Sequence, residues 1–216
     1  MLPVSNVIDR IGYLLLDSNH IRFPVAELLL WSNEAMGAIL TRKPGAFAQT
    51  VVASLVAGTK QTIPEGGATF LDVTRNIKAD GVTPGRAVRR SDRQLLDDTD
   101  PDWHTSKAKG EIRNYTFDDR IPKTFYCYPP AIAGTKVELV HAVLPADVTT
   151  EAGSLDIAPE YLETVANYVA YRCNSKDSEY ANPAAAVAFY QAFEAALGNK
   201  ANAENMTSPN QAQNSV

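Results

Sequence analysis

The spacing of apolar residues changes twice along this chain, and that change limits the possible folds more than any other feature. Near the start, Val4, Ile8 and Ile11 recur at intervals of three or four residues, which is typical of the buried face of an α-helix. From about Gln49 apolar residues follow a period of two, as they do in β-strands. At Asp156 the helical spacing returns. The sequence therefore predicts an α+β protein with helices at both ends and strands between them.

The same pattern predicts how the chain is divided. Residues 1–47 form an N-terminal helical pair, 48–145 a β-rich insertion, and 146–198 a C-terminal helical pair. Each helix has one apolar stripe that must be buried, so we expect the two pairs to complete a four-helix bundle. Residues 199–216 are rich in Asn, Ala, Gln and Ser and carry few large apolar side chains, so we expect a flexible tail in the free protein.

Turn-forming residues divide the middle of the chain into short strands. Asp80-Gly81, Pro84-Gly85 and Pro129-Pro130 are pairs that favour turns. Ser91 is placed to cap a short helical turn after the third strand. The predicted strands cover residues 49–56, 70–77, 86–90, 111–117, 123–128 and 135–143.

Charge and length narrow the classes of function. The chain has 216 residues, 45% of them hydrophobic and 21% charged, which is ordinary for a folded soluble domain. Its net charge of −5 disfavours a nucleic-acid clamp, because phosphate contacts need an excess of Lys and Arg. Arg86, Arg89, Arg90 and Arg93 form a local basic run, which we interpret as a solvated edge or ion-pair face in preference to a phosphate site.

Cysteine spacing and hydropathy exclude two further classes. Cys127 and Cys173 match neither a C-x-x-C redox pair nor a zinc ligand set, so both are expected to be buried free thiols. No apolar run approaches the ~20 residues that a membrane span needs, and we expect no membrane contact.

The segment DDTDPDWH contains the sharpest metal-binding pattern in the chain. Asp98, Asp100 and Asp102 reproduce the D-x-D-x-D start of a calcium loop. The sixth position should be Gly but is Trp103, and the twelfth should be Glu but is Lys109. The segment therefore lacks most of the ligands that a calcium loop requires.

Two interpretations of residues 97–104 stay open. In the first, a metal-dependent or acid/base enzyme is centred on this segment, and Asp98 and Asp102 are needed for activity. In the second, the segment is a solvated turn, and Trp103 anchors it to a core or to a neighbouring subunit. The sequence favours the second, because it has no H-E-x-x-H, G-x-S-x-G or phosphate-loop motif that would supply a reaction.

Several motifs occur in an order that resembles a known family. They are RFP-x-x-ELLLW at residues 22–31, VAGTKQ at 56–61, LD-x-x-RN at 71–76, DPDWH at 100–104, and KDSEYA at 176–181. In this order the motifs resemble the phage head-to-tail adaptor family, also called the connector or tail tubular protein A family. The resemblance covers residues 4–198.

The resemblance implies a structural virion protein and no enzyme. It implies a twelve-subunit ring under the portal protein that extends the DNA channel and offers a docking platform for a tail nozzle or other tail component. Genomic DNA then passes through the lumen without specific binding, and the protein lies at the virion neck after assembly in the host cytoplasm. It implies no catalytic residue, and we expect no metal and no cofactor. A neck or tail-completion protein that binds the tail tube is the alternative.

The resemblance also directs attention to interfaces. In related adaptors a C-terminal segment folds against the portal, so we expect residues 199–216 to become ordered on binding. We expect the turn around Trp103 to contact a neighbouring subunit or the tail. The predicted interface residues are Trp103, Asp102, Arg75, Tyr128, Asn199, Met206 and Val216.

Overall fold

The protein consists of two compact units. A computed structural model describes the backbone of residues 1–207 and the side chains of residues 1–198. The helical unit combines residues 1–46 with the chain from residue 145 onward, and the β unit is the continuous segment 47–144.

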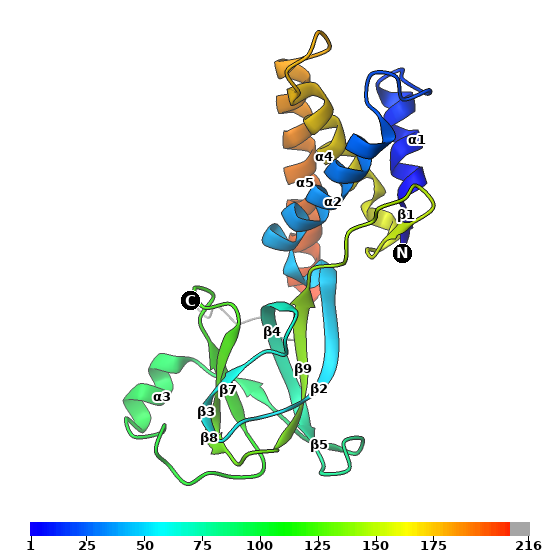
Figure 1. Cartoon of the computed structure of the whole chain (residues 1–216). Helices are drawn as coiled ribbons and strands as arrows, with labels where there is room; N and C mark the ends of the chain where they lie inside the picture. Colours follow the sequence, from blue (N-terminus) through cyan, green and yellow to red (C-terminus); the bar gives the residue numbers. More distant parts are fainter. Residues whose placement is uncertain (208–216) are drawn as a thin grey trace. The chain divides into compact units, whose positions relative to one another are not determined.

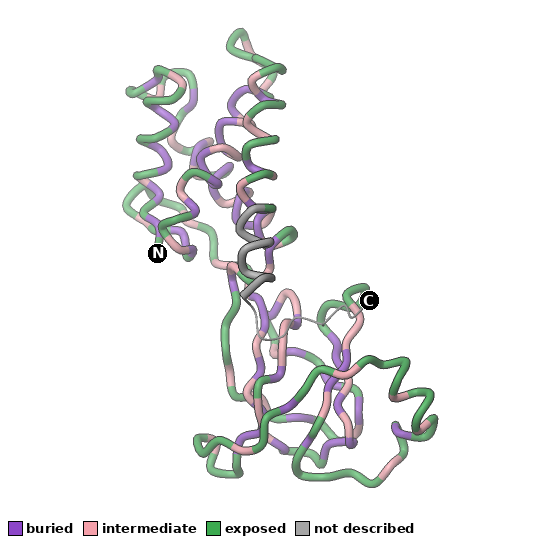
Figure 2. Tube along the Cα trace, turned by 180° about the vertical axis from the view of Figure 1, so that it is seen from behind, coloured by how far each residue is buried: buried purple, intermediate pink, exposed green. Residues whose placement is uncertain are grey.

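Helices from both ends of the sequence build the helical unit (Figure 1). They are α1 (Val4–Leu14), α2 (Val25–Arg42), α4 (Leu162–Ser175) and α5 (Pro183–Thr207). The stripes expected from the sequence are the buried faces, as with Val4, Val7, Ile8 and Ile11 of α1. Figure 2 shows how buried and exposed residues alternate along these helices.

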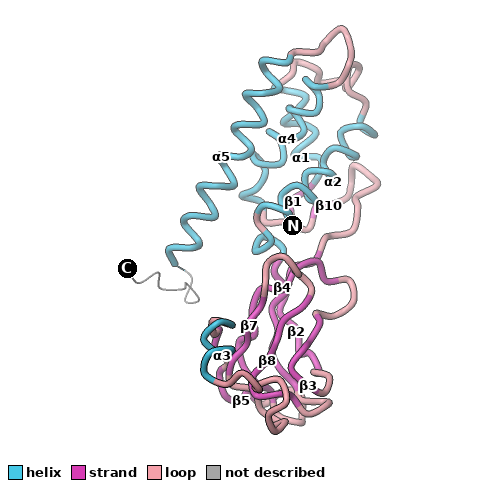
Figure 3. The backbone as a smooth tube through the Cα atoms, turned by 90° about the vertical axis from the view of Figure 1, so that its left-hand side faces the viewer, coloured by secondary structure: helices cyan, strands magenta, loops and turns pink. Residues whose placement is uncertain are grey.

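A short strand pair and a 3₁₀ turn complete the helical unit. Strand β1 (Leu2–Pro3) pairs antiparallel with β10 (Ser154–Leu155), so the first residues of the chain lie beside the segment that leads to α4 (Figure 3). The 3₁₀ turn η2 (Pro159–Tyr161) then starts α4 with a proline in its first turn. Leu2, Leu155 and Tyr161 are all buried there.

The prediction of a four-helix bundle is wrong. The described residues form five α-helices and ten strands in three sheets. Helix α4 packs against α1, α2 and α5, whereas α5 packs chiefly on α4. A bundle requires four stripes that share one centre, and here α4 is the common neighbour instead. Apolar stripes show that a helix is covered on one side, but they do not show which helix covers it.

The first sheet of the β unit has the strand order β2-β9-β4-β5. Its strands are β2 (Ala48–Ser54), β9 (Lys136–Val143), β4 (Gly67–Ile77) and β5 (Pro84–Ala87), all antiparallel. The 3₁₀ turn η1 (Pro44–Phe47) precedes β2. Along β9 every second residue from Val137 to His141 is buried, as the period-two pattern predicted.

The second sheet has the order β3-β8-β7-β6. Its strands are β3 (Gly58–Thr62), β8 (Thr124–Ala131), β7 (Asn114–Phe117) and β6 (Arg89–Arg90), and β6 pairs with β7 in parallel. Helix α3 (Arg93–Thr99) follows β6. The sequence did not predict β3, because Gly58-Thr59-Lys60 has the composition of a turn. Gly58 does adopt a left-handed φ of 104°, and the strand begins there.

One apolar core joins the two sheets of the β unit. Phe70 and Val73 of the first sheet and Phe125 and Cys127 of the second belong to the same buried cluster. Phe70 stacks on Phe125 with 4.6 Å between ring centroids. The chain enters this unit at β2 and leaves it at β9, and these strands are paired so that Ala48 lies opposite Ala142.

Helix α5 extends beyond Gly198, where the sequence suggested its end, and reaches Thr207. It therefore includes the first part of the predicted tail, while residues 208–216 lie outside the described residues. The expected flexibility of the tail concerned the free protein, and it stays a prediction.

Candidate functional site

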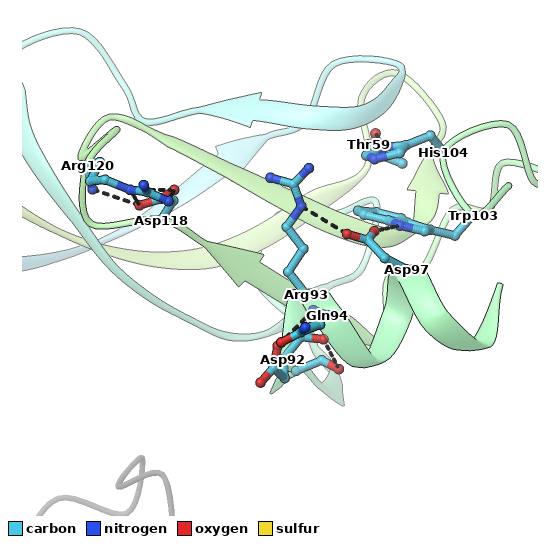
Figure 4. A network of polar contacts seen from close by, with 10 residues as sticks. Thr59, Asp92, Arg93, Gln94, Asp97, Trp103, His104, Asp118 and Arg120 are labelled. Atoms are coloured by element: carbon cyan, nitrogen blue, oxygen red, sulfur yellow. Dashed lines mark hydrogen bonds and ion pairs between the residues drawn. The ribbon is translucent and has the colours of Figure 1, made fainter. Parts of the chain in front are cut away.

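The acidic segment at residues 97–104 begins in the last residues of helix α3 and continues as a turn fixed to the second sheet (Figure 4). Asp92 caps helix α3 by accepting a hydrogen bond of 2.8 Å from the backbone N–H of Gln94. Asp97 accepts a hydrogen bond of 2.8 Å from Nε1 of Trp103 and lies 3.4 Å from the Arg93 guanidinium. The carboxylate of Asp97 thus links the helix to the tryptophan that follows it.

Trp103 is the anchor of this turn. Its side chain is completely buried, and the ring of His104 stacks on it with 3.7 Å between centroids. The rings of Tyr126 and Tyr128 on β8 pack against the indole in a T-shaped geometry, with 6.4 and 6.3 Å between ring centroids. His104 in turn hydrogen-bonds Thr59 of β3 over 2.8 Å. Burial of the tryptophan and its neighbours therefore holds the turn against two strands of its own chain.

The carboxylates of the calcium-like pattern are not gathered around a common centre. Within the described part of the chain, no three His, Cys, Asp or Glu side chains lie close enough to hold a metal ion. Asp98 and Asp102 are exposed, and Asp100 is half-buried. The contacts that the segment makes are those of an anchored turn.

The predicted interface residues occupy different parts of the molecule. Trp103 is buried, Asp102 beside it is exposed, and Tyr128 is half-buried on β8. Arg75 lies on β4 and donates two hydrogen bonds, of 2.6 and 2.9 Å, to Glu138 on the neighbouring strand. The structure thus brings together Trp103, Asp102 and Tyr128 but not Arg75.

The three C-terminal interface residues cannot be placed in the same way. Asn199 and Met206 are residues of helix α5, of which the structure describes only the backbone at these positions. Val216 lies outside the described residues. That any of the seven residues contacts a partner stays a prediction.

A buried amide joins the two sheets, and no pattern in the sequence indicates it. Asn76 of β4 is 3% exposed and donates to the carbonyl oxygens of Arg86 and Ile112 at 2.9 and 2.8 Å. Its own carbonyl oxygen accepts from the Ile112 N–H at 2.9 Å. The segment before β7 is therefore held against β4 by one side chain that satisfies three backbone groups.

A second polar link crosses the core nearby. The Tyr115 hydroxyl on β7 donates a hydrogen bond of 2.6 Å to Asp72 on β4. Burial, together with this acceptor, raises the pKa of Tyr115 well above its ordinary value, so the hydroxyl stays protonated and keeps donating. Both links fix how one sheet packs on the other.

Three arginines line a pocket of about 340 Å³ beside these links. They are Arg86 on β5, Arg89 on β6 and Arg113 before β7, and Ala87 and Asn114 complete the wall. No ion pair joins any of the three to an acidic side chain among the residues whose side chains are described. The basic run in the sequence includes two of these arginines. Arg113 was missed, since it joins them only through the pairing of β6 with β7.

Comparison with known proteins decides the family. The family model described as SU10 adaptor protein matches residues 3–213, which is nearly the whole chain. The chain belongs to the SU10 adaptor family. This result confirms the resemblance to phage head-to-tail adaptors that the order of motifs suggested. No curated protein matches the chain.

Membership assigns a structural role. As an adaptor, the protein is a component of the virion and associates with the portal and tail components of a phage. The adaptor family implies a structural protein. None of the helices in the described part of the chain combines the length and apolar character needed to cross a bilayer.

Proposed function

We propose that this adaptor forms a twelve-subunit ring beneath the portal, extends the channel through which DNA leaves the head, and serves as the docking platform for the tail. The observation that carries this proposal is the match of the adaptor family to residues 3–213, which includes both units. The remaining support comes from surfaces that a single chain leaves uncovered.

The connection between α1 and α2 is one such surface. Leu16 and Ile21 are 85% and 79% exposed, which is costly for large apolar side chains in water. The loop is nevertheless ordered, because the Asp17 carboxylate accepts hydrogen bonds of 2.9 to 3.0 Å from the backbone N–H groups of Ile21, Arg22 and Phe23. An ordered loop that displays apolar side chains is expected in a protein that works inside an assembly.

We further propose that residues 199–216, including Asn199, Met206 and Val216, contact the portal. The support is the polar composition of this segment, which leaves few apolar side chains to pack within the chain and suits contact with a partner. The turn that holds Asp102 and Trp103 is proposed to face a neighbouring subunit or the tail, with Tyr128 supporting it from β8.

Electron microscopy of portal-containing heads tests the ring. Heads that lack the adaptor are incubated with the purified full-length chain and imaged. We expect a twelvefold ring of adaptor density on the outer face of the portal, and we expect a chain truncated after Gly198 to bind much more weakly. Normal docking of the truncated chain would remove the proposed role of the tail segment.

Two other outcomes contradict the ring itself. Density with a symmetry other than twelvefold would refute the stoichiometry. Binding to isolated tail tubes, with none to heads, would identify a neck or tail-completion protein instead.

A further inference from the structure

The arginine pocket formed by Arg86, Arg89 and Arg113 is the most unusual charged surface in the β unit. Neighbouring arginines are engaged: Arg93 lies 3.4 Å from Asp97, and Arg90 is 4.7 Å from the centre of the Phe117 ring. The three pocket arginines are exposed and have neither kind of contact in the described residues. Three arginines that line one pocket without counter-charge repel each other, and an external anionic group would relieve that repulsion.

The same unit carries a matching set of unpaired carboxylates. Asp98, Asp100 and Asp102, called here the acidic turn, make no side-chain hydrogen bond and no ion pair within the described part of the chain. The turn is held in place by the burial of Trp103 and by its bond to Asp97. It therefore presents three carboxylates on a fixed backbone.

Positive and negative side chains in the β unit are nearly equal in number but are grouped in separate places. Residues 47–144 contain 13 Lys and Arg and 12 Asp and Glu, so the acidic surplus of the chain resides outside this unit. Within it, residues 86–90 hold three arginines and no acid, whereas residues 97–102 hold four aspartates and no base. A nearly neutral body with two opposite patches is suited to pairing with copies of itself.

The two patches are formed by different elements of the unit. Helix α3, which contains Asp98, is on the side away from β5, which contains Arg86 (Figure 1). A contact between two different patches on neighbouring copies is heterologous, and repetition of such a contact gives a ring when the rotation closes.

We propose that the arginine pocket of one copy binds the acidic turn of the next copy around the ring. This inference rests on the proposed ring and names the surfaces that join its β units. Arginine suits the role, since its planar guanidinium forms paired hydrogen bonds with a carboxylate. Each copy uses its pocket toward one neighbour and its acidic turn toward the other.

The phosphate backbone of DNA is the competing occupant, and charge disfavours it. The unit as a whole offers a polyanion almost no net attraction, and the acidic turn repels it over the Debye length of roughly 8 Å at physiological salt. A second copy supplies three carboxylates to the arginine pocket, and the contact removes both sets of charges from solvent. DNA binding is therefore an outcome that the test must distinguish.

Charge reversal and its rescue provide the test. The full-length variant R86E/R89E/R113E, the variant D98K/D100K/D102K, and the chain with all six changes are each added to adaptor-free heads, and bound copies per portal are counted by electron microscopy and quantitative mass spectrometry. K60E/K109E/K123E is the matched control, because it makes the same change of charge at three exposed lysines of the same unit.

Each triple variant is expected to lower occupancy at fixed concentration by roughly tenfold or more, because like charges then face each other across the interface. The six-residue variant is expected to recover the occupancy of the wild type, and the control to keep it. Unchanged thermal melting of each variant confirms that the β unit is folded. Recovery is decisive, since a damaged fold or a lost DNA site is not repaired by reversing the acidic turn.

Three results would overturn the inference in ways that separate it from the proposed function. If the wild type forms the ring and both triple variants do so equally well, the ring stands but these are not its contacts. If the arginine variant forms the ring but loses salt-dependent binding to a 30-base-pair duplex, the pocket binds DNA. If the wild type itself forms no ring, the proposed function is refuted, and the inference that rests on it is refuted with it.

Chemical cross-linking gives an independent measurement. The variant R89C/D100C is assembled on heads and treated with a short bis-maleimide, and covalent multimers are expected on a denaturing gel, whereas R89C alone and D100C alone should remain monomers. The native thiols do not interfere, because Cys127 and Cys173 are buried and burial raises their pKa values to about 11 and about 12. Multimers from either single variant, or none from the double variant, would contradict the proposed pairing.

Discussion

The helical unit and the β unit are held together by different means. In the helical unit, helices from the two ends of the sequence meet, and ion pairs such as Glu34 with Arg172, at 3.2 Å, and Glu27 with Lys176, at 2.7 Å, link them at the surface. In the β unit one continuous segment closes on itself, and buried polar links at Asn76 and Tyr115 cross its core. The β unit is therefore local in sequence, whereas the helical unit depends on parts that the chain keeps far apart.

This difference suggests a division of tasks. Polar groups buried in the β unit can be satisfied in only one arrangement of the two sheets, which specifies a single geometry for surfaces such as the acidic turn. Between the helices of the helical unit, the ion pairs of Glu34 with Arg172 and of Glu27 with Lys176 are partly exposed, so water can replace them more easily. A single specified geometry in the β unit suits a protein whose surfaces must meet those of other virion parts.

Separation of the two units should have the largest effect. A fragment of residues 47–144 is expected to fold with a cooperative thermal transition, because it contains its whole core. A fragment of residues 1–46 is expected to lose its structure completely, since α1 and α2 bury their stripes against α4. Far-ultraviolet circular dichroism of both fragments measures this. A fully helical N-terminal fragment, or an unfolded β fragment, would reverse the comparison.

Truncation of a core side chain should have the next largest effect. Phe70 is 2% exposed and contacts the rings of Phe125, Tyr115 and Phe117, so Phe70→Ala is expected to lower the free energy of unfolding by about 3–5 kcal/mol. Leu28→Ala on α2 is the counterpart in the helical unit, with an expected loss of about 2–5 kcal/mol. Urea titration followed by hydrogen exchange shows which unit each change loosens. If Phe70→Ala also loosened α2, the units would not be independent.

Two asparagines with similar roles provide a closer comparison. Asn76→Ala leaves three backbone groups without partners, and both groups of Ile112 among them are buried, so the expected loss is about 3 kcal/mol. Asn33 of α2 likewise bridges both backbone groups of Val148, at 2.9 and 3.0 Å, but it is only half-buried. Asn33→Ala should therefore cost about 1 kcal/mol, because water can replace the amide. Equal losses in urea unfolding would show that burial does not set the difference.

Removal of a surface ion pair should have the smallest effect. Arg10 of α1 pairs with Glu163 of α4, and both side chains are more than half exposed. Arg10→Ala is expected to cost about 0.2–1 kcal/mol, and the difference from the wild type should shrink in 1 M salt. Thermal melting at two salt concentrations measures it. A loss above about 2 kcal/mol that persists in high salt would mean that this pair matters for packing as well as charge.

The sequence predicted elements better than their contacts. The change of apolar period correctly indicated where helices give way to strands, because burial of one face determines that period. The apolar period did not predict how the helices pack on one another. An apolar stripe on α5 can be buried by one helix as well as by three, and here α4 alone covers most of it. Strand β3 was missed because its first residues have the composition of a turn.

The interface role predicted for the candidate site stays a prediction, whereas the position of Trp103 in the fold could be judged from its residue type. Trp103 was predicted to anchor the acidic segment, and its complete burial confirms this, because an indole of that size is rarely left in water. Asn76 and Arg113 were not predicted. Each acquires its role from a partner distant in sequence, either Ile112 across the core or Arg89 on the adjacent strand, and a single chain gives no sign of such meetings.

The pairing of Ala48 with Ala142 has a consequence for how such a protein can change. The two ends of the β unit are cross-strand neighbours. The segment between them is therefore joined to the rest of the chain at two points that lie side by side. A graft of this segment into a surface loop of an unrelated host would require almost no linker. Phages that exchange genes could therefore replace one such module with another and leave the flanking helices as they are.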